Sequence, residues 1–173
     1  SSGKLQINPS PVLLKSAIGN LVSQLSADLE PRRLRVHQEH NPDTPVIYAE
    51  PPLIEKALQH LIVNAIKFTP DGGHIYIRTR PAALDDGRPA AEVSIRDTGI
   101  GLDPDERQLI FEKFYQIEPP ARHSSSKTAF KGGGQGMGLA IARGVALAHG
   151  GKLWVESARH DEVNLPGSTF YLV

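Results

Sequence analysis

The most informative stretch of this chain is residues 50–70, EPPLIEKALQHLIVNAIKFTP, which reads as one long amphipathic helix. Pro51 and Pro52 are tolerated in the first turn of a helix, so the helix is predicted to begin there. Its apolar residues recur at spacings of three and four, the period of a helix that packs on a core. They are Leu53, Ile54, Ala57, Leu58, Leu61, Ile62, Ala65 and Ile66. The turn residues at 70–73 then end the helix.

The same helix carries a second, polar face formed by His60, Asn64 and Lys67, which lie at positions i, i+4 and i+7. Residues at this spacing share one side of a helix, here offset from the apolar stripe. The amide oxygen of Asn64 is a neutral ligand suited to Mg²⁺. The ammonium group of Lys67 can meet a phosphate as a point charge. The alternative is an ordinary solvated helix face, and the helix alone does not decide between the two.

Strand and helix patterns surround this helix. Period-two alternation or short apolar runs predict strands at 4–7, 34–39, 46–48, 74–80, 91–96, 152–157 and 168–173. Helical spacing predicts two more helices, at about 11–28 and 137–149, and turn residues predict a polar hairpin over 81–90. The expected fold class is α+β, a two-layer α/β sandwich in which a mixed, mostly antiparallel sheet is covered on one face by about three helices. Residues 1–173 are expected to form one domain.

Composition excludes several classes of function. The 173 residues suit one domain with its own core, and 39% are hydrophobic. The 19 basic and 19 acidic residues give no net charge, so we expect no nucleic-acid partner and no membrane contact by this domain. Cysteine is absent, which removes disulfides, thiolate metal sites and cysteine nucleophiles, and fits a cytoplasmic location. No apolar run reaches transmembrane length.

Two glycine-containing segments suggest ligand contacts. Residues 97–101, DTGIG, follow a predicted strand, and glycine there permits positive φ and close approach of a ligand to the backbone. A buried Asp97 could accept a hydrogen bond from an exocyclic amine such as that of adenine. Residues 132–139, GGGQGMGL, run directly into a helix, whose bare N–H groups form an anion site. The alternatives are a plain strand-exit turn and a flexible linker. Neither segment fits the P-loop or dinucleotide-binding pattern.

Taken together, these segments resemble the ATP-binding domain of sensor histidine kinases, in the superfamily shared with DNA gyrase, the heat-shock chaperone ATPase and mismatch-repair ATPases. The resemblance covers nearly the whole chain. Its motifs are the asparagine box at 50–70, the first glycine box at 97–101, the phenylalanine box at 110–116, the second glycine box at 134–142 and the closing strand at 167–170. The resemblance implies ATP and Mg²⁺ as ligands, ADP as product, and residues 102–135 as the ATP lid.

The resemblance also implies a role for each matching residue. Asn64 should coordinate the Mg²⁺ that bridges the triphosphate, and Lys67 should contact phosphate. Asp97 should bind the adenine amino group, with Thr169 helping through water. The floor under the base should be formed by Gly99, Ile100 and Gly101.

The resemblance assigns the remaining contacts to the lid and the helix that follows it. Backbone donors to the phosphates should come from Gly136, Met137, Gly138 and Leu139. Tyr115 is expected near the nucleotide, with Phe111 and Phe114 anchoring the lid. Gln116 stands where many of these kinases have an arginine that steadies the transferring phosphoryl group. Since charge on that group is normally offset by cations, another lid cation would have to substitute. The candidates are Lys113, Arg122, Lys127 and Lys131.

His60 separates the kinase interpretation from hydrolysis. The hydrolases of the superfamily resemble one another in carrying a glutamate four residues before the magnesium asparagine, where it activates water as a general base. Here that position is His60, so we expect phosphoryl transfer to a protein histidine, with His60, Asn64 and Lys67 as the catalytic set. A non-catalytic nucleotide-binding signalling module is the alternative, and an ATP hydrolase is a further one.

The acceptor histidine is expected on a separate dimerisation domain, which would pass the phosphoryl group to a response regulator. No histidine of this chain has the His-Glu or His-Asp context, followed by a basic residue and proline, of such acceptors. His37 and His40 look like a metal pair, but on a strand their spacing puts them on opposite faces, so a plain surface role is expected.

Overall fold

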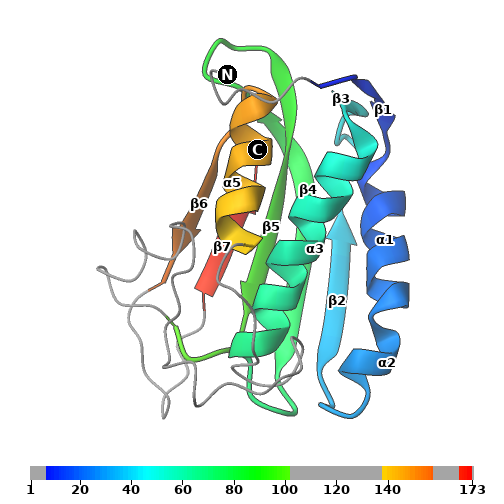
Figure 1. The fold of residues 1–173 in the computed structure, drawn as a ribbon, viewed down its shortest axis with the longest axis vertical. Helices are drawn as coiled ribbons and strands as arrows, with labels where there is room; N and C mark the ends of the chain where they lie inside the picture. The colour runs from blue at the N-terminus through cyan, green and yellow to red at the C-terminus, as the bar shows by residue number, and fades with distance from the viewer. Residues whose placement is uncertain (1–6, 102–137, 158–167, 173) are drawn as a thin grey trace.

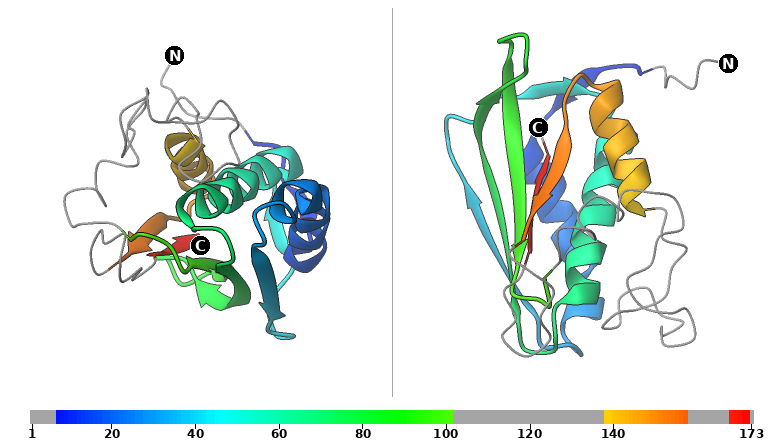
Figure 2. Two further views of the ribbon diagram at one scale, coloured as in Figure 1. Left: turned by 90° about the horizontal axis from the view of Figure 1, so that it is seen from below. Right: turned by 90° about the vertical axis from the view of Figure 1, so that its left-hand side faces the viewer.

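The computed structural model describes residues 7–101, 138–157 and 168–172, and the helices of this part cover one face of a sheet (Figures 1 and 2). The helices are α1 (Leu14–Gln24), α2 (Ser26–Leu29), α3 (Pro51–Phe68) and α5 (Gly138–Ala148). The strands are β1 (Ser10–Val12), β2 (Arg35–His40), β3 (Ile47–Ala49), β4 (His74–Ala83), β5 (Pro89–Asp97), β6 (Leu153–Glu156) and β7 (Ser168–Leu172). No helix in these ranges is long and apolar enough to cross a lipid bilayer.

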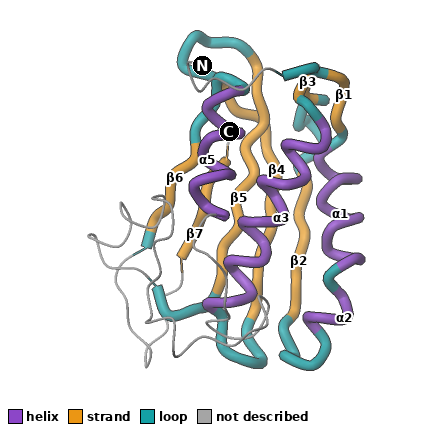
Figure 3. Tube along the Cα trace, viewed as in Figure 1, coloured by secondary structure: helices purple, strands orange, loops and turns teal. Residues whose placement is uncertain are grey.

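The main sheet has five strands in the order β2-β4-β5-β7-β6 (Figure 3). β2 and β4 are parallel, whereas β4 with β5, β5 with β7 and β6 with β7 are antiparallel. The short strands β1 and β3 form a separate antiparallel pair. The predicted two-layer α+β architecture with a mixed, mostly antiparallel sheet is therefore confirmed.

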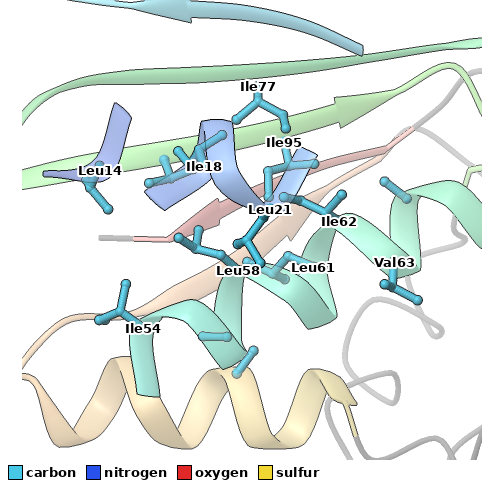
Figure 4. Close-up of a cluster of buried hydrophobic side chains, with 14 of the residues drawn as sticks. Leu14, Ile18, Leu21, Ile54, Leu58, Leu61, Ile62, Val63, Ile77 and Ile95 are labelled. Carbon is cyan, nitrogen blue, oxygen red and sulfur yellow. The ribbon is translucent and has the colours of Figure 1, made fainter. Parts of the chain in front are cut away.

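The core lies between the sheet and the helices α1 and α3 (Figure 4). Ile18 of α1 and Leu58 and Ile62 of α3 are completely buried, as are Ile77 of β4 and Ile95 of β5. The stripe predicted on residues 50–70 is thus the face of α3 that packs on the core. Burying each such side chain contributes about 1.5–3 kcal/mol, so this stripe fixes how α3 sits on the sheet.

The N-terminal region differs from the prediction of one helix over residues 11–28. Pro11 and Val12 belong to β1 and pair with Tyr48 and Ile47 of β3, and helix begins only at Leu14. The helical pattern is also interrupted at Leu25, which separates α1 from α2. Pairing between strands about 37 residues apart is not visible in local periodicity, which explains the error. The strand predicted at 4–7 lies outside the described residues except for Ile7, which is not in a strand.

A hairpin joins β4 and β5, as predicted for residues 81–90, but its paired strands extend further toward the turn than predicted. β4 continues to Ala83 and β5 begins at Pro89, so only the intervening residues form the turn. Gly87 has φ +88° there, a conformation that favours glycine. Both strands extend further into the predicted hairpin because Pro81 and Pro89 are accommodated within paired strands near its tip.

The helices α3 and α5 run antiparallel (Figure 1). His149, just after α5, connects them at one end. The backbone N–H of Glu50, just before α3, donates to His149 Nε2 at 3.0 Å, and His149 Nδ1 lies 2.8 Å from the carbonyl oxygen of Val145. Gly150 has φ +77°, in agreement with the predicted glycine cap after this helix. Because α5 has 11 residues and α3 has 18, α5 begins partway along α3 rather than level with its last residue (Figure 1).

The other face of the sheet carries His37, which stacks on Tyr76 with ring centroids 4.8 Å apart. His40 lies on the opposite face of the same strand, where its Nδ1 is 2.8 Å from Thr79 Oγ1. The predicted separation of the two histidines is therefore correct. Within the described ranges, no group of three or more histidine and acidic side chains is arranged to hold a metal ion.

Burial, with a smaller contribution from Lys15, lowers the pKa of His40 below its usual 6.5. At pH values just below 6.5, His40 is therefore protonated more in the unfolded chain than in the native protein. The free energy of unfolding consequently falls as the pH drops. We expect His40→Gln to lose less stability than the wild type between about pH 7 and about pH 5. Urea unfolding at both pH values measures this, and equal acid sensitivity of the two proteins would contradict it.

Candidate functional site

The predicted ligand-binding residues that the structure describes lie on the last turns of α3, at the end of β5, at the start of α5 and in β7. α5 starts partway along α3, whereas α3 and β5 both run toward one end of the domain (Figure 1). The start of β7 reaches the same place, since Ser168 pairs with Asp97. The fold thus brings the asparagine-bearing helix and the first glycine segment together.

The polar face of α3 is present as predicted and is half-buried rather than fully solvated. His60, Asn64 and Lys67 are each of intermediate exposure, beside the buried stripe of the same helix. The Nε2 atom of His60 is shielded from solvent. A plain solvated helix face would leave such side chains exposed, so this face of α3 is not simply solvated.

The acid of the first glycine segment is buried at the end of β5. Asp97 is 3% exposed, and its Oδ1 accepts a hydrogen bond from the backbone N–H of Gly99 at 2.9 Å. An ionised carboxylate offers about four acceptor positions, so it can accept several hydrogen bonds at once. A buried carboxylate needs donors, and a ligand amine placed against it would provide one.

Gly99 is required at its position by close backbone packing. A Cβ on this residue would collide with the backbone carbonyl of Phe68, the last residue of α3, and would lie 2.6 Å from Asp97 Oδ1. The next residue, Ile100, is buried and donates its backbone N–H to the same Phe68 carbonyl at 3.2 Å. Gly101 has φ +77°. The segment therefore packs closely against the end of α3.

A side chain also anchors this loop. The hydroxyl Oγ1 of Thr98 accepts a hydrogen bond from the backbone N–H of His74 at 2.9 Å, and the backbone N–H of Thr98 donates to the His74 carbonyl at 3.1 Å. The loop is thus fixed to the start of β4 as well as to α3. Thr98 had no predicted role, although its place inside the DTGIG motif was a signal.

The remaining predicted residues are only partly described. Gly138 is the first residue of α5 and Leu139 is half-buried in its first turn. Thr169 lies opposite Arg96 in the β5–β7 register, and it is Ser168 that lies opposite Asp97. Tyr115, Gly136 and Met137, with Phe111, Phe114, Gln116 and the lid predicted at 102–135, lie outside the described residues.

These groups suit a ligand that is basic or amine-bearing at one end and anionic at the other. Asp97 can accept hydrogen bonds from an amine, and Gly99 and Gly101 beside it have no side chain that could block a planar ring. Asn64 supplies an amide oxygen and Lys67 a cation, while the start of α5 adds the partial positive charge of a helix N-terminus. An adenine nucleotide carrying a metal ion has this distribution of groups.

Known proteins with related sequences include ATPases and sensory kinases. Residues 49–173 match the family model described as histidine kinase-, DNA gyrase B-, and HSP90-like ATPase. The adaptive-response sensory kinase SasA of Synechococcus elongatus is 32% identical over 171 residues, which are 99% of this chain and 40% of that protein. The chain therefore spans less than half the length of this relative.

Two solved structures share the fold. The mycobacterial sensor histidine kinase MprB superposes with a TM-score of 0.71 at 26% identity, covering 95% of each chain. The full-length ShkA structure, in complex with AMPPNP, superposes with a TM-score of 0.75 at 25% identity over 98% of this chain and 31% of that one.

Proposed function

Because the chain belongs to the histidine kinase-, DNA gyrase B- and HSP90-like ATPase family, we propose that it binds ATP with Mg²⁺ and transfers the γ-phosphoryl group to a histidine on a separate acceptor domain. Its relatives place it among the ATP-binding domains of two-component sensor histidine kinases. The observation that carries the proposal is the buried Asp97, bonded to Gly99 in a segment that packs against the C-terminal end of α3.

In this proposal the purine lies against residues 97–101 and the phosphates point toward α3 and α5. Asp97 accepts the hydrogen bond of the adenine amino group, which selects adenine over a base with an acceptor at that position. Gly99, Ile100 and Gly101 lie under the ring. Gly136, Met137, Gly138 and Leu139 offer backbone donors to the phosphates at the start of α5.

The proposed metal site fits the residues present, because the half-buried Asn64 offers a neutral oxygen of the type that Mg²⁺ accepts. When bound, Mg²⁺ neutralises charge that builds up on the phosphate oxygens. Lys67, one helical turn further, holds phosphate by charge. Tyr115 and Thr169 remain proposed nucleotide contacts, and a cation of the lid would replace the arginine expected at Gln116.

The phosphoryl acceptor and the response regulator are proposed partners, since the chain spans 40% of its SasA relative. The direct test mixes this domain with the acceptor hairpin of its own kinase and γ-labelled ATP. Labelled histidine, stable to alkali and labile to acid, is the expected result. Nucleotide binding without any label would contradict phosphoryl transfer and favour a non-catalytic signalling module.

His60 distinguishes transfer from hydrolysis. Since an imidazole replaces the usual glutamate base, we expect slow ATP hydrolysis by the isolated domain and no change in that rate on His60→Ala, measured as phosphate release under saturating ATP. Asn64→Ala is the comparison, because it removes the proposed metal ligand and should abolish Mg²⁺-dependent binding. Rapid hydrolysis that collapses on His60→Ala would identify an ATP hydrolase instead.

A further inference from the structure

Arg32, in the loop between α2 and β2, directs its guanidinium into the C-terminal end of α3. Its Nη1 donates to the carbonyl oxygen of Ile66 at 2.8 Å, its Nη2 donates to the carbonyl of Thr69, and its Nε donates to Asp71 Oδ1 at 2.5 Å. The residue is only 9% exposed, although its sequence context, PRRLR, suggests a surface loop. We call these three contacts the Arg32 clamp.

The carbonyl of Ile66 needs such a donor for a local reason. Within a helix, the partner of this carbonyl would be the N–H four residues later, and that residue is Pro70, which has no N–H. A buried carbonyl without a donor costs about 1–3 kcal/mol, and a charged donor is stronger than a neutral one. Arg32 therefore completes the last turn of α3, the turn that carries Lys67.

Backbone contacts extend the clamp along the turn after α3. The N–H of Gly72 donates to the Arg32 carbonyl at 2.9 Å, and the N–H of Arg35 donates to the Gly73 carbonyl at 3.1 Å. Arg33 adopts φ 52°, a left-handed conformation rare for residues other than glycine and asparagine. This sharp bend lets Arg32 point inward while the chain enters β2.

The same turn also contacts residues 97–101. Ile100 donates to the Phe68 carbonyl at 3.2 Å, and a Cβ on Gly73 would lie 2.9 Å from Thr98 Oγ1. The turn from residue 66 to residue 73 is consequently in contact with both Arg32 and residues 97–101. A displacement of this turn would change the separation between the polar face of α3 and Asp97.

We propose that Arg32 is a positioning residue for nucleotide binding, which sets the spacing between the metal and phosphate groups of α3 and the adenine-binding segment 97–101. The effect on nucleotide binding rests on the proposed function, whereas the Arg32 clamp itself is seen in the structure. A ligand held at both ends is sensitive to this spacing. In enzymes, misplacement of bound groups by about 1 Å can lower the reaction rate by a factor of about 100. Arg32 touches neither end of the ligand in this arrangement and acts through α3.

The binding test compares Arg32→Met, Arg32→Lys and the neighbouring Arg33→Asn, each kept well below its melting temperature. The readout is the gain in ATP affinity that Mg²⁺ gives over EDTA, measured by calorimetry. We expect this gain to fall about tenfold in Arg32→Met, and also in Arg32→Lys because a lysine cannot reproduce the planar fork. Arg33→Asn removes the same charge, tolerates the left-handed conformation, and should keep the wild-type gain.

A second readout needs no nucleotide. Hydrogen exchange of the Ile100 amide, which donates to Phe68, should become about tenfold faster in Arg32→Lys, while the Ile95 amide within β5 stays as protected as in the wild type. Unchanged Ile100 exchange, or an unchanged Mg²⁺ gain in a folded variant, would overturn the inference. If the wild type itself bound no Mg²⁺-ATP, the proposed function would fall, and exchange at Ile100 would still decide whether the clamp holds the loop.

Discussion

Asp97→Asn is expected to abolish the rise in melting temperature that ATP or ADP with Mg²⁺ gives to the wild-type domain. The substitution keeps the shape of the side chain, and its carbonyl oxygen can still accept from Gly99. It nevertheless replaces an acceptor by an NH₂ group that would face the amino group of adenine, leaving two donors opposed. Losing such a bond in a buried site should weaken binding by about 100-fold.

The size of the expected effect follows from linkage. A ligand present at about 100 times its Kd stabilises the native state by about 2.7 kcal/mol, which raises the melting temperature of a domain this size by about 5–10 °C. After a 100-fold loss of affinity the same concentration only equals the Kd, and the stabilisation drops to about 0.4 kcal/mol. Differential scanning fluorimetry resolves the two cases.

Asp43→Asn is the matched control, because Asp43 is an exposed aspartate in the connection between β2 and β3. It makes the same chemical change away from the site and should retain the full nucleotide-induced shift. If nucleotide raised the melting temperature of Asp97→Asn as much as that of the wild type, adenine would lie elsewhere. The proposed function would then lose its main support.

Gly99→Ala is expected to produce the second large effect, on both stability and binding. The new methyl group would collide with the carbonyl of Phe68, and because that atom is backbone it cannot swing aside as a side chain would. Overpacking of this kind costs about 1–3 kcal/mol. The relief available is to push residues 97–101 away from α3, which breaks the bond from Ile100 to Phe68 and moves Asp97.

Gly19→Ala is the control for this change. Gly19 lies in the middle of α1, and a Cβ there would meet no atom within 4 Å. Replacing a helical glycine with alanine in open space should stabilise the domain by about 0.5–1 kcal/mol. Thermal unfolding of the two variants should therefore shift in opposite directions. Equal stability of Gly99→Ala and the wild type would show that the loop does not pack against α3 as described.

Local pattern was sufficient for much of this molecule. The apolar spacing on residues 50–70 predicted α3 and its buried side, and the i, i+4, i+7 spacing of His60, Asn64 and Lys67 predicted that they share a face. Alternation predicted the sheet strands to within a few residues. The roles of Tyr115, Gly136 and Met137 stay predictions, as they lie outside the described residues.

The sequence alone therefore determined most of the elements, their order and the shared helix face of His60, Asn64 and Lys67, because helix and strand periods are properties of neighbouring residues. Only the tertiary structure showed the β1–β3 pairing, the contact of Gly99 with the Phe68 carbonyl, and the inward turn of Arg32 toward Ile66. These depend on backbone groups brought together over tens of residues. Every residue carries the same carbonyl, and nearly every residue carries the same N–H. Contacts between these backbone groups therefore cannot be predicted from the pattern of side chains.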